Sequence, residues 1–269
     1  GTYNLQTSDF TTGGRRVGAP ANVEFELRPL APFMRVASDD EALFADETTT
    51  LQLVVDHEGS VEGVTDIDAT LYLPPQLALA SPANLTTTCP GNTATNPNLN
   101  QMNLSGFDLA AGASCTASID VVAVAPGADD IIFASLSSAG PSRAGTLTLP
   151  VSELPTGSLV SNATVWVVDE PSTLLVEIDH ADGAKAATSL SGTLTLPEGT
   201  SAVVANAGQC GGSATVNGQT VTLQGAVDAG DSCAFAINIT PTTLGTLVFD
   251  DAPFTFAHGA FVVDGPRDG

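Results

Sequence analysis

Most of the chain alternates apolar and polar residues in short runs, such as TLQLVVD (50–56), ATLYLP (69–74), LLVEID (174–179) and AFAINIT (234–240). Alternation with a period of two places every second side chain on one face, which is typical of strands with one buried side. Clusters of Gly, Pro, Asn and Asp separate the runs and predict turns. No window of 12 or more residues has helical spacing. The pattern therefore predicts an all-β protein.

The pattern also repeats itself. The phrase AAGASC (110–115) precedes one alternating run and DAGDSC (228–233) precedes another, and TTLQLVVDH (49–57) matches STLLVEIDH (172–180). The offsets are 118 residues from Cys115 to Cys233 and 123 residues from His57 to His180. A period this long predicts tandem domains. Short strands within units of this size favour tandem immunoglobulin-like β-sandwiches, which we expect at residues 31–151 and 152–265, with a terminal strand pair at 1–30 and a tail at 266–269.

Four cysteines follow the same repeat. Each phrase has an upstream partner, Cys89 for Cys115 and Cys210 for Cys233, at separations of 26 and 23 residues. Paired cysteines at a repeated spacing predict one disulfide in each unit and an oxidising compartment. The alternative is a four-cysteine metal site, but no C-x-x-C sequence occurs and the pairs belong to different units. Few aromatic residues are available for the cores, so a disulfide across each loop would add stability.

Charge restricts the partners. The 269 residues carry 30 acidic and seven basic side chains, a net charge of −23. This excess argues against binding to nucleic acid or to an anionic membrane surface, and it suits a medium rich in salt or calcium. No apolar run reaches 18 residues, so we expect no membrane insertion in this segment.

The first 28 residues look like the end of a unit without its beginning. NVEFEL (22–27) resembles TLTLPV (146–151) and AFVVD (260–264), the closing strands of the two units. An isolated strand pair is marginally stable in water, so it needs a sheet to join. One interpretation is excision from a longer array. The other is strand donation to a neighbouring molecule through Val23, Phe25 and Leu27, which would generate a filament.

These motifs together resemble a known family. The sequences ADETTTLQLVVDHEG, LYLPPQLALASPANLTTTC, NLSGFDLAAGASCTASIDV and TLTLPV are similar to the bacterial surface-repeat family called domain of unknown function eleven. The resemblance covers residues 31–151 well and 157–265 less well. It implies extracellular immunoglobulin-like modules of long secreted or cell-wall proteins, with the two cysteines of each unit bonded, and it implies no activity. The Pro-Gly-Gly turn of the family is replaced by ADE (45–47) and DEP (169–171).

Candidate chemistry is sparse. Acidic clusters at 38–47 and 167–171 near the expected domain joins supply oxygen ligands, so Asp39, Asp40 and Asp169 are candidates for calcium, although no EF-hand loop is present. The alternative is a solvated acidic surface. His57 and His180 hold equivalent places after a strand and are expected to form a repeated polar strand end rather than a shared zinc site. We expect Trp166 to pack in a core or at a domain junction.

No catalytic motif is recognisable, and no cofactor is expected apart from calcium. G-x-S-x-G is absent, and paired acids are too abundant to indicate a glycosidase. The sequence therefore predicts a non-enzymatic, structural protein at the cell surface or outside the cell: a repeat unit of a microbial filament or stalk, with copies of itself as partners. The alternative is a ligand-binding adhesin module of a long secreted surface protein.

Overall fold

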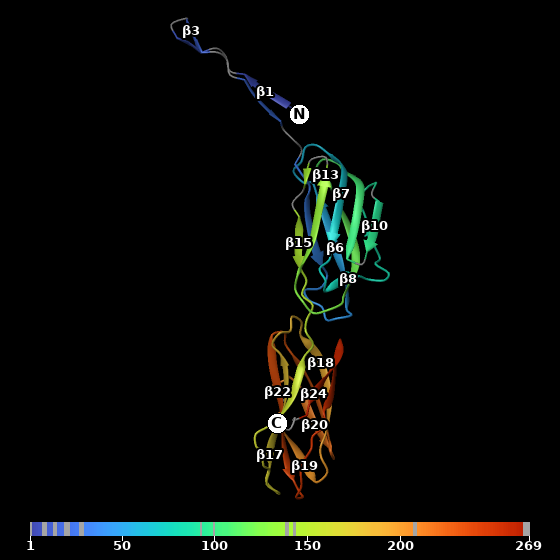
Figure 1. Ribbon diagram of the computed structural model, residues 1–269, viewed down its shortest axis with the longest axis vertical. Coiled ribbons are helices and arrows are strands. Elements are labelled where there is room, and N and C mark those ends of the chain that lie inside the picture. Colours follow the sequence, from blue (N-terminus) through green and yellow to red (C-terminus); the bar gives the residue numbers. More distant parts are fainter. Residues whose placement is uncertain are drawn as a thin grey trace.

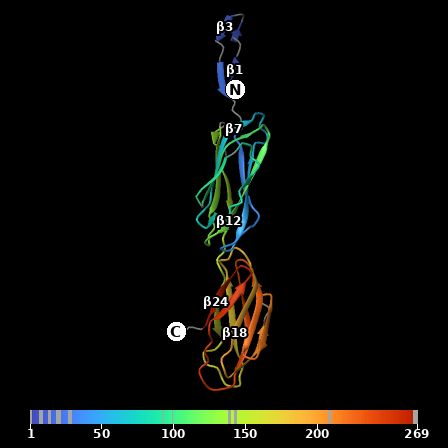
Figure 2. The ribbon, with the colours of Figure 1, turned by 90° about the vertical axis from the view of Figure 1, so that its right-hand side faces the viewer.

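The computed structural model describes the chain except residues 1, 7–9, 13–14, 19–21, 27–29, 92, 99, 138–139, 142–143, 207–208 and 266–269. The described residues form strands, turns and loops and contain no helix. Two bodies of strands lie end to end along the long axis (Figures 1 and 2). We call them the first unit (residues 33–151) and the second unit (residues 156–264).

The first unit is built from two antiparallel sheets. One has the order β10-β11-β7-β13-β14, with β15 also paired to β13, and the other has the order β5-β6-β12-β8, with β9 also paired to β12. The strands are β5 (Phe33–Ser38), β6 (Thr48–Asp56), β7 (Val64–Tyr72), β8 (Leu77–Leu79), β9 (Thr86–Thr87), β10 (Thr93–Asn98), β11 (Gln101–Leu109), β12 (Ser114–Ala123), β13 (Asp130–Ser137), β14 (Gly140–Pro141) and β15 (Gly145–Thr148).

The second unit uses the same central pairing in a single larger sheet. Its order is β19-β22-β17-β16-β24-β23-β18-β21-β20. The strands are β16 (Thr156–Ser161), β17 (Ser172–His180), β18 (Ala187–Thr195), β19 (Thr200–Asn206), β20 (Ser213–Asn217), β21 (Thr220–Val227), β22 (Asp231–Pro241), β23 (Ala252–Phe256) and β24 (Gly259–Asp264). The pairing β16-β17-β22 in this unit corresponds to β5-β6-β12 in the first.

The sheet of the second unit differs from the expected pair of separate sheets. Its two halves are joined by β16 and β24, which pair in parallel at Gly157 opposite Val263 and at Ser158 opposite Asp264. Gly157 permits this approach, because a Cβ built there would lie 2.5 Å from a methyl carbon of Val263. The continuous sheet is thus a local consequence of one residue without a side chain.

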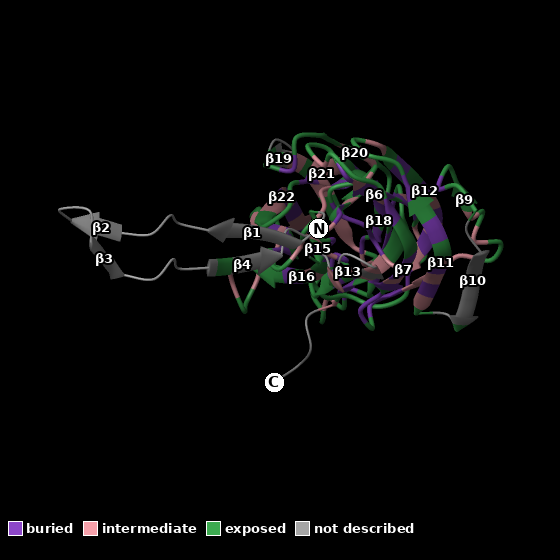
Figure 3. Cartoon of the chain, turned by 90° about the horizontal axis from the view of Figure 1, so that it is seen from above, coloured by how far each residue is buried: buried purple, intermediate pink, exposed green. Residues whose placement is uncertain are grey.

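Each unit has its own apolar core, formed by the inward residues of the alternating runs. Along β6, Leu51, Leu53 and Val55 are buried and the residues between them are more exposed, and β12 shows the same alternation (Figure 3). The corresponding side chains of β17 are Leu174, Val176 and Ile178. The alternation visible in the sequence therefore separates core from surface in both units.

A disulfide lies within each unit. Cys89 is bonded to Cys115 and Cys210 to Cys233, and the Cα–Cα distances are 4.9 and 5.0 Å. The downstream cysteines occupy matching ladder positions, Cys115 opposite Val55 and Cys233 opposite Ile178. The repeated turn-and-cysteine phrase therefore places a cross-link at the start of the same strand in each unit.

The N-terminal strands form small sheets of their own. β1 (Thr2–Gln6) pairs with β4 (Asn22–Glu26), and β2 (Phe10–Thr12) pairs with β3 (Arg15–Gly18). Neither pair shares a ladder with the sheets of the two units. The two strands expected at this end of the chain are therefore paired with each other.

Candidate functional site at the junction of the two units

Phe44 belongs to the first unit in sequence but is buried in the core of the second. Its side chain is fully buried and is part of the apolar cluster that contains Leu174 and Phe254. The Phe44 ring packs edge-on against Phe256, with 5.0 Å between centroids, and is nearly parallel to the rings of His180 at 6.0 Å and His258 at 5.7 Å. Burial of a phenylalanine contributes about 2–3 kcal/mol, so this side chain fastens the two units together.

A tight turn presents Phe44 to the second unit. Asp46 has φ 67°, in the left-handed region that Asp tolerates better than most residues. The amide of Asp46 donates to the carbonyl of Ala123 at 2.8 Å, and the amide of Glu47 donates to the carbonyl of Phe44 at 3.2 Å. The Glu47 carboxylate accepts from the amide of Phe44 at 2.7 Å. These bonds fix the direction in which the Phe44 side chain leaves the first unit.

Glu47 also carries the ionic contacts of the junction. Lys185 Nζ, from the second unit, lies 2.7 Å from Glu47 Oε2 and 6.0 Å from the centroid of the Phe44 ring. His258 Nδ1 contacts Glu47 Oε1, which adds a second ion pair when the imidazole is protonated. Only 17% of the Glu47 side chain is exposed. One carboxylate therefore joins the turn of the first unit to two basic side chains of the second.

Backbone contacts complete the junction. Leu43 and Val151 form an isolated parallel bridge, with hydrogen bonds from Leu43 to Pro150 at 3.0 Å and from Ser152 to Leu43 at 2.7 Å. The buried Ser152 hydroxyl then accepts from the amides of Ala184 at 3.0 Å and Lys185 at 3.3 Å. The connecting segment is thus bonded to both units, which restricts the hinge that a two-domain chain would otherwise have.

The two strand-end histidines are both buried and both contact a backbone carbonyl, but the carbonyls come from different segments. His180 Nε2 lies 2.7 Å from the carbonyl of Lys185, and His57 Nε2 lies 2.7 Å from the carbonyl of Leu30. Both rings are buried, and neither Nδ1 has a hydrogen-bond partner. A carbonyl accepts but cannot donate, so Nε2 carries the proton in both rings. The expectation of a repeated polar strand end describes both positions.

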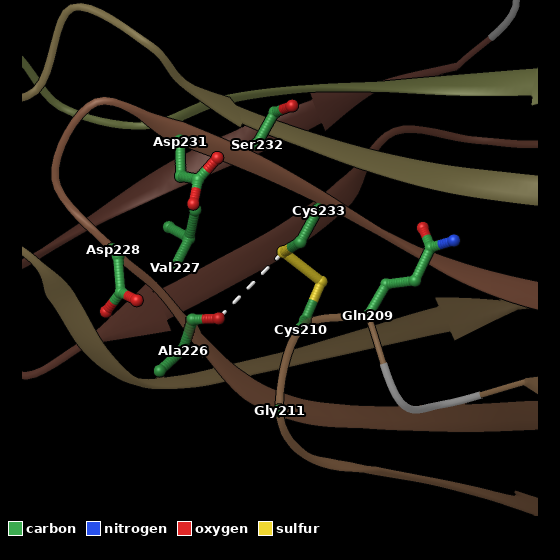
Figure 4. A pocket seen from close by; sticks show the side chains of 9 residues that line it. All are labelled: Gln209, Cys210, Gly211, Ala226, Val227, Asp228, Asp231, Ser232 and Cys233. Atoms are coloured by element: carbon green, nitrogen blue, oxygen red, sulfur yellow. Dashed lines mark hydrogen bonds between the residues drawn. A yellow bond between two sulfur atoms is a disulfide. The ribbon is translucent and has the colours of Figure 1, made fainter.

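A shallow hollow of about 230 Å³ lies beside the second disulfide. Asp228, Asp231 and Ser232 surround it, and the Cys233 sulfur points toward the carbonyl of Ala226 at 3.9 Å (Figure 4). Asp228 belongs to the turn before β22 and Asp231 is the first residue of β22, so the hollow is a property of the turn-and-cysteine phrase. It exposes one edge of the disulfide to solvent.

The calcium candidates do not converge. Asp39 and Asp40 follow β5, whereas Asp169 precedes β17, whose other end, His180, lies at the junction. The nine residues of β17 therefore separate Asp169 from the junction by about 30 Å. Within the described ranges, no group of three or more His, Cys, Asp or Glu side chains is arranged to hold a metal ion. These residues therefore cannot share one ion, and calcium binding at Asp39 and Asp40 or at Asp169 stays a prediction.

The strand-donation candidates lie in β4 and after it. Val23 is opposite Leu5 and Phe25 is opposite Tyr3 in the β1–β4 ladder, and Val23 is 58% exposed. Leu27 lies outside the described residues. The pairing of β1 with β4 does not show whether β4 can be donated to a neighbouring molecule, so strand donation stays a prediction.

Sequence reasoning missed Phe44 and Glu47, the central residues of the junction. Both lie in the acidic segment SDDEALFADE, whose charge favours a solvated loop. A signal was nonetheless present, because ALF is an apolar triplet inside an acidic segment at a domain boundary.

Trp166 has the packing role that the sequence predicts. Its ring lies 5.8 Å from that of Phe249, and it is half-buried against the core of the second unit.

Comparison with protein families gives one match. A model described as Domain of unknown function (DUF7933) matches residues 32–151, which is the first unit. This family differs from domain of unknown function eleven, which the sequence motifs resemble. The match therefore gives that resemblance no support. Among curated proteins, no sequence matches this chain.

Several solved structures share the fold. The C-terminal domain of the Streptococcus pyogenes antigen I/II-family protein AspA has a TM-score of 0.51 and 9% identity, over 87% of this chain and 98% of that one. A structure titled BspA_C_WT has a TM-score of 0.50, 12% identity and the same coverage. The C-terminal domain of the Streptococcus agalactiae AgI/II polypeptide BspA aligns at a TM-score of 0.45 and 11% identity over the same shares. The TM-scores of the first two matches show a shared fold, and their low sequence identities show nothing beyond the fold.

Within the described part of the chain, no helix has the length and apolar character needed to cross a bilayer.

Proposed function

We propose that this chain is a structural protein of the extracellular space or cell surface, in which tandem immunoglobulin-like units are locked into a stiff rod. The observation that carries the proposal is the complete burial of Phe44, a first-unit residue, in the core of the second unit. A flexible linker would leave such a side chain in water or in its own unit. The position of Phe44 instead favours a fixed angle between the units.

Internal correspondences support the idea that the two units are copies of one module. Both have the same central strand pairing, a disulfide at the start of the equivalent strand, and a buried histidine at the end of the strand paired with it. A chain of such copies extends in one direction, because the polypeptide enters each unit at one end and leaves it at the other. This architecture suits a spacer or stalk.

The location is inferred from chemistry and from the fold. Two disulfides require an oxidising compartment, which in bacteria lies outside the cytoplasm. The net charge of −23 keeps such a rod soluble and repels other acidic polymers. The shared fold of the antigen I/II-family C-terminal domain agrees with a place in a bacterial surface protein. The role needs neither a catalytic site nor a cofactor.

Polymerisation belongs to the same proposal. Copies of the chain are the expected partners, and strand donation by residues 1–28 through Val23, Phe25 and Leu27 is one route to a filament. A second route is end-to-end docking of the rods.

Small-angle X-ray scattering of the dilute chain tests the rod. We expect the longest distances between atoms of the chain to be narrowly distributed, and added salt should not change this distribution. Phe44→Ser should broaden this distribution because the joint loses its anchor, whereas the control Phe33→Ser, at a half-exposed position, should leave it unchanged. If the unmodified chain already scatters as two freely jointed bodies, the proposed function is wrong.

A further inference from the structure

The turn that docks the first unit onto the second is present again at the far end of the second unit (Figure 1). Asp169 has φ 66°, as Asp46 has φ 67°. The amide of Asp169 donates to Pro241 at 2.9 Å, at the end of β22, as the amide of Asp46 donates to Ala123 at the end of β12. The amide of Glu170 donates to Val167 at 3.1 Å, as the amide of Glu47 donates to Phe44. Val167 therefore occupies the place of Phe44.

Among the described residues, no neighbouring unit covers the second copy of the turn. Phe44 is fully buried at the internal junction, whereas Val167 is 54% exposed and Val165 is 79% exposed. Leu244 and Val248, in the loop after β22, are exposed as well, and Trp166 and Phe249 lie beneath this end of the unit. The far end of the second unit thus presents exposed apolar side chains on a turn. The equivalent turn of the first unit buries its apolar residue, Phe44, at the junction.

The opposite end of the rod repeats one part of the receiving surface, the strand-end histidine and the loop after it. At the junction this surface contains His180 and the loop that follows it, up to Lys185. In the first unit, His57 and the loop to Glu62 hold the same places, offset by 123 residues. Leu30, Phe33 and Val61 lie exposed around this end. This end of the first unit therefore carries the counterparts of His180 and its loop, beside Leu30, whose carbonyl contacts His57.

We propose that these two ends dock onto each other in separate copies of this chain, so that the copies stack head to tail with the geometry of the internal junction. The turn Val165–Glu170 of one copy packs on the His57 end of the next. An interface that repeats head to tail without closing produces a linear assembly. This inference rests on the proposed function, since only a stiff rod propagates one direction of stacking.

Charge sets the strength of the contact. At the internal junction Glu47 meets Lys185, but between copies the equivalent residues are Glu170 and Glu62, which repel each other. The internal joint is thereby favoured over the joint between copies. The unmodified chain should associate weakly, and a single reversal at Glu62 should supply the missing cation.

Sedimentation velocity of the full chain over a range of concentrations tests the proposal. We expect concentration-dependent growth of the unmodified chain, and Glu62→Lys should lower the dissociation constant about tenfold because a repulsive pair becomes attractive. Val167→Asp should abolish association in both backgrounds. Val203→Asp, at a site on β19 that is 69% exposed, is the matched control and should associate as the unmodified chain does.

Two results would overturn the proposal. One is a Glu62→Lys chain that remains monomeric at every concentration, like Val167→Asp. The other is association that Val167→Asp leaves intact but Phe25→Asp removes, which would assign assembly to strand donation. Scattering at low concentration, where chains are monomeric, reports on the stiffness of the single rod, so failure of docking and failure of the rod are distinguishable.

Discussion

The ring of Phe44 packs edge-on against the ring of Phe256, with 5.0 Å between their centroids, across the boundary between the two units. Phe256 ends β23 of the second unit, and Phe44 precedes β6 of the first. Their contact makes the stability of one unit depend on the presence of the other.

Removal of the Phe44 ring should destabilise the second unit rather than the first. Phe44→Ala leaves a cavity in the core of the second unit, so its free energy of unfolding should fall by about 3–5 kcal/mol. Trp166, the single tryptophan, lies in the second unit, so its fluorescence during denaturant unfolding reports this loss. Phe33→Ala, at a half-exposed site of the first unit, serves as the control, and an equal shift for both variants would contradict the assignment.

The ion pair between Glu47 and Lys185 should contribute modestly. Both side chains are partly exposed, so a double-mutant cycle with Glu47→Gln and Lys185→Met should give a coupling free energy of about 0.2–1 kcal/mol. The coupling should decrease in high salt because ions screen it. Pairing Lys185→Met with Glu58→Gln, an exposed residue elsewhere, should give no coupling; a coupling as large as that of Glu47 would refute a specific pair.

The two disulfides should differ in their reactivity toward reductants. Cys233 is half-buried beside a hollow, whereas Cys89 and Cys115 are both buried. Thiolate attack requires access to a sulfur atom, so Cys210–Cys233 should be reduced first under native conditions. Timed alkylation followed by peptide mass spectrometry gives the order. Full loss of either bond should cost about 3 kcal/mol, and simultaneous reduction of both bonds would show that the hollow gives no access.

Acid should remove a small stabilisation centred on Asp120. Hydrogen bonds from Asn84 and Thr50, each 2.7 Å long, hold the pKa of the Asp120 carboxyl below its usual value of 3.8. A carboxyl whose pKa is lowered by folding stabilises the folded state above its unfolded pKa, and this contribution is lost as the pH falls through the lowered value. Asp120→Asn should therefore lower the melting temperature at pH 7 but much less at pH 2.

Calorimetry at the two pH values measures that difference. Asp68→Asn, at another strand carboxylate, is the comparison, because the asparagine oxygen can still accept the hydrogen bond that the amide of Gly106 donates. If Asp120→Asn lowers the melting temperature equally at both pH values, the carboxylate charge is not responsible for the stabilisation.

The sequence predicted the parts of the fold that depend on local pattern. Alternation along TLQLVVD and LLVEID identified the buried faces of β6 and β17, because the period of a strand is visible within seven residues. The repeated cysteine phrase identified both cross-links, since spacing and order are properties of the chain itself. The matching histidines, His57 and His180, were identified for the same reason.

Contacts between units were beyond such reasoning. Phe44 lies among acids, and only the surface of the second unit decides that its ring is buried rather than solvated. Likewise, the parallel pairing of β16 with β24 depends on the missing side chain of Gly157, which meets Val263 about a hundred residues later. A pattern along one strand contains no information on which distant strand will approach it.

The parallel pairing of β16 with β24 has a mechanical consequence. β16 is the first strand after the junction and β24 is the last described strand, so tension along the rod pulls on the beginning of one and the end of the other. In neighbouring parallel strands these pulls act in opposite directions along the strand axes. The ladder is then loaded in shear, and its hydrogen bonds, together with those of β16 to β17, must break together rather than one by one. The two residue pairs of this parallel ladder thus oppose stretching of the second unit along its long axis.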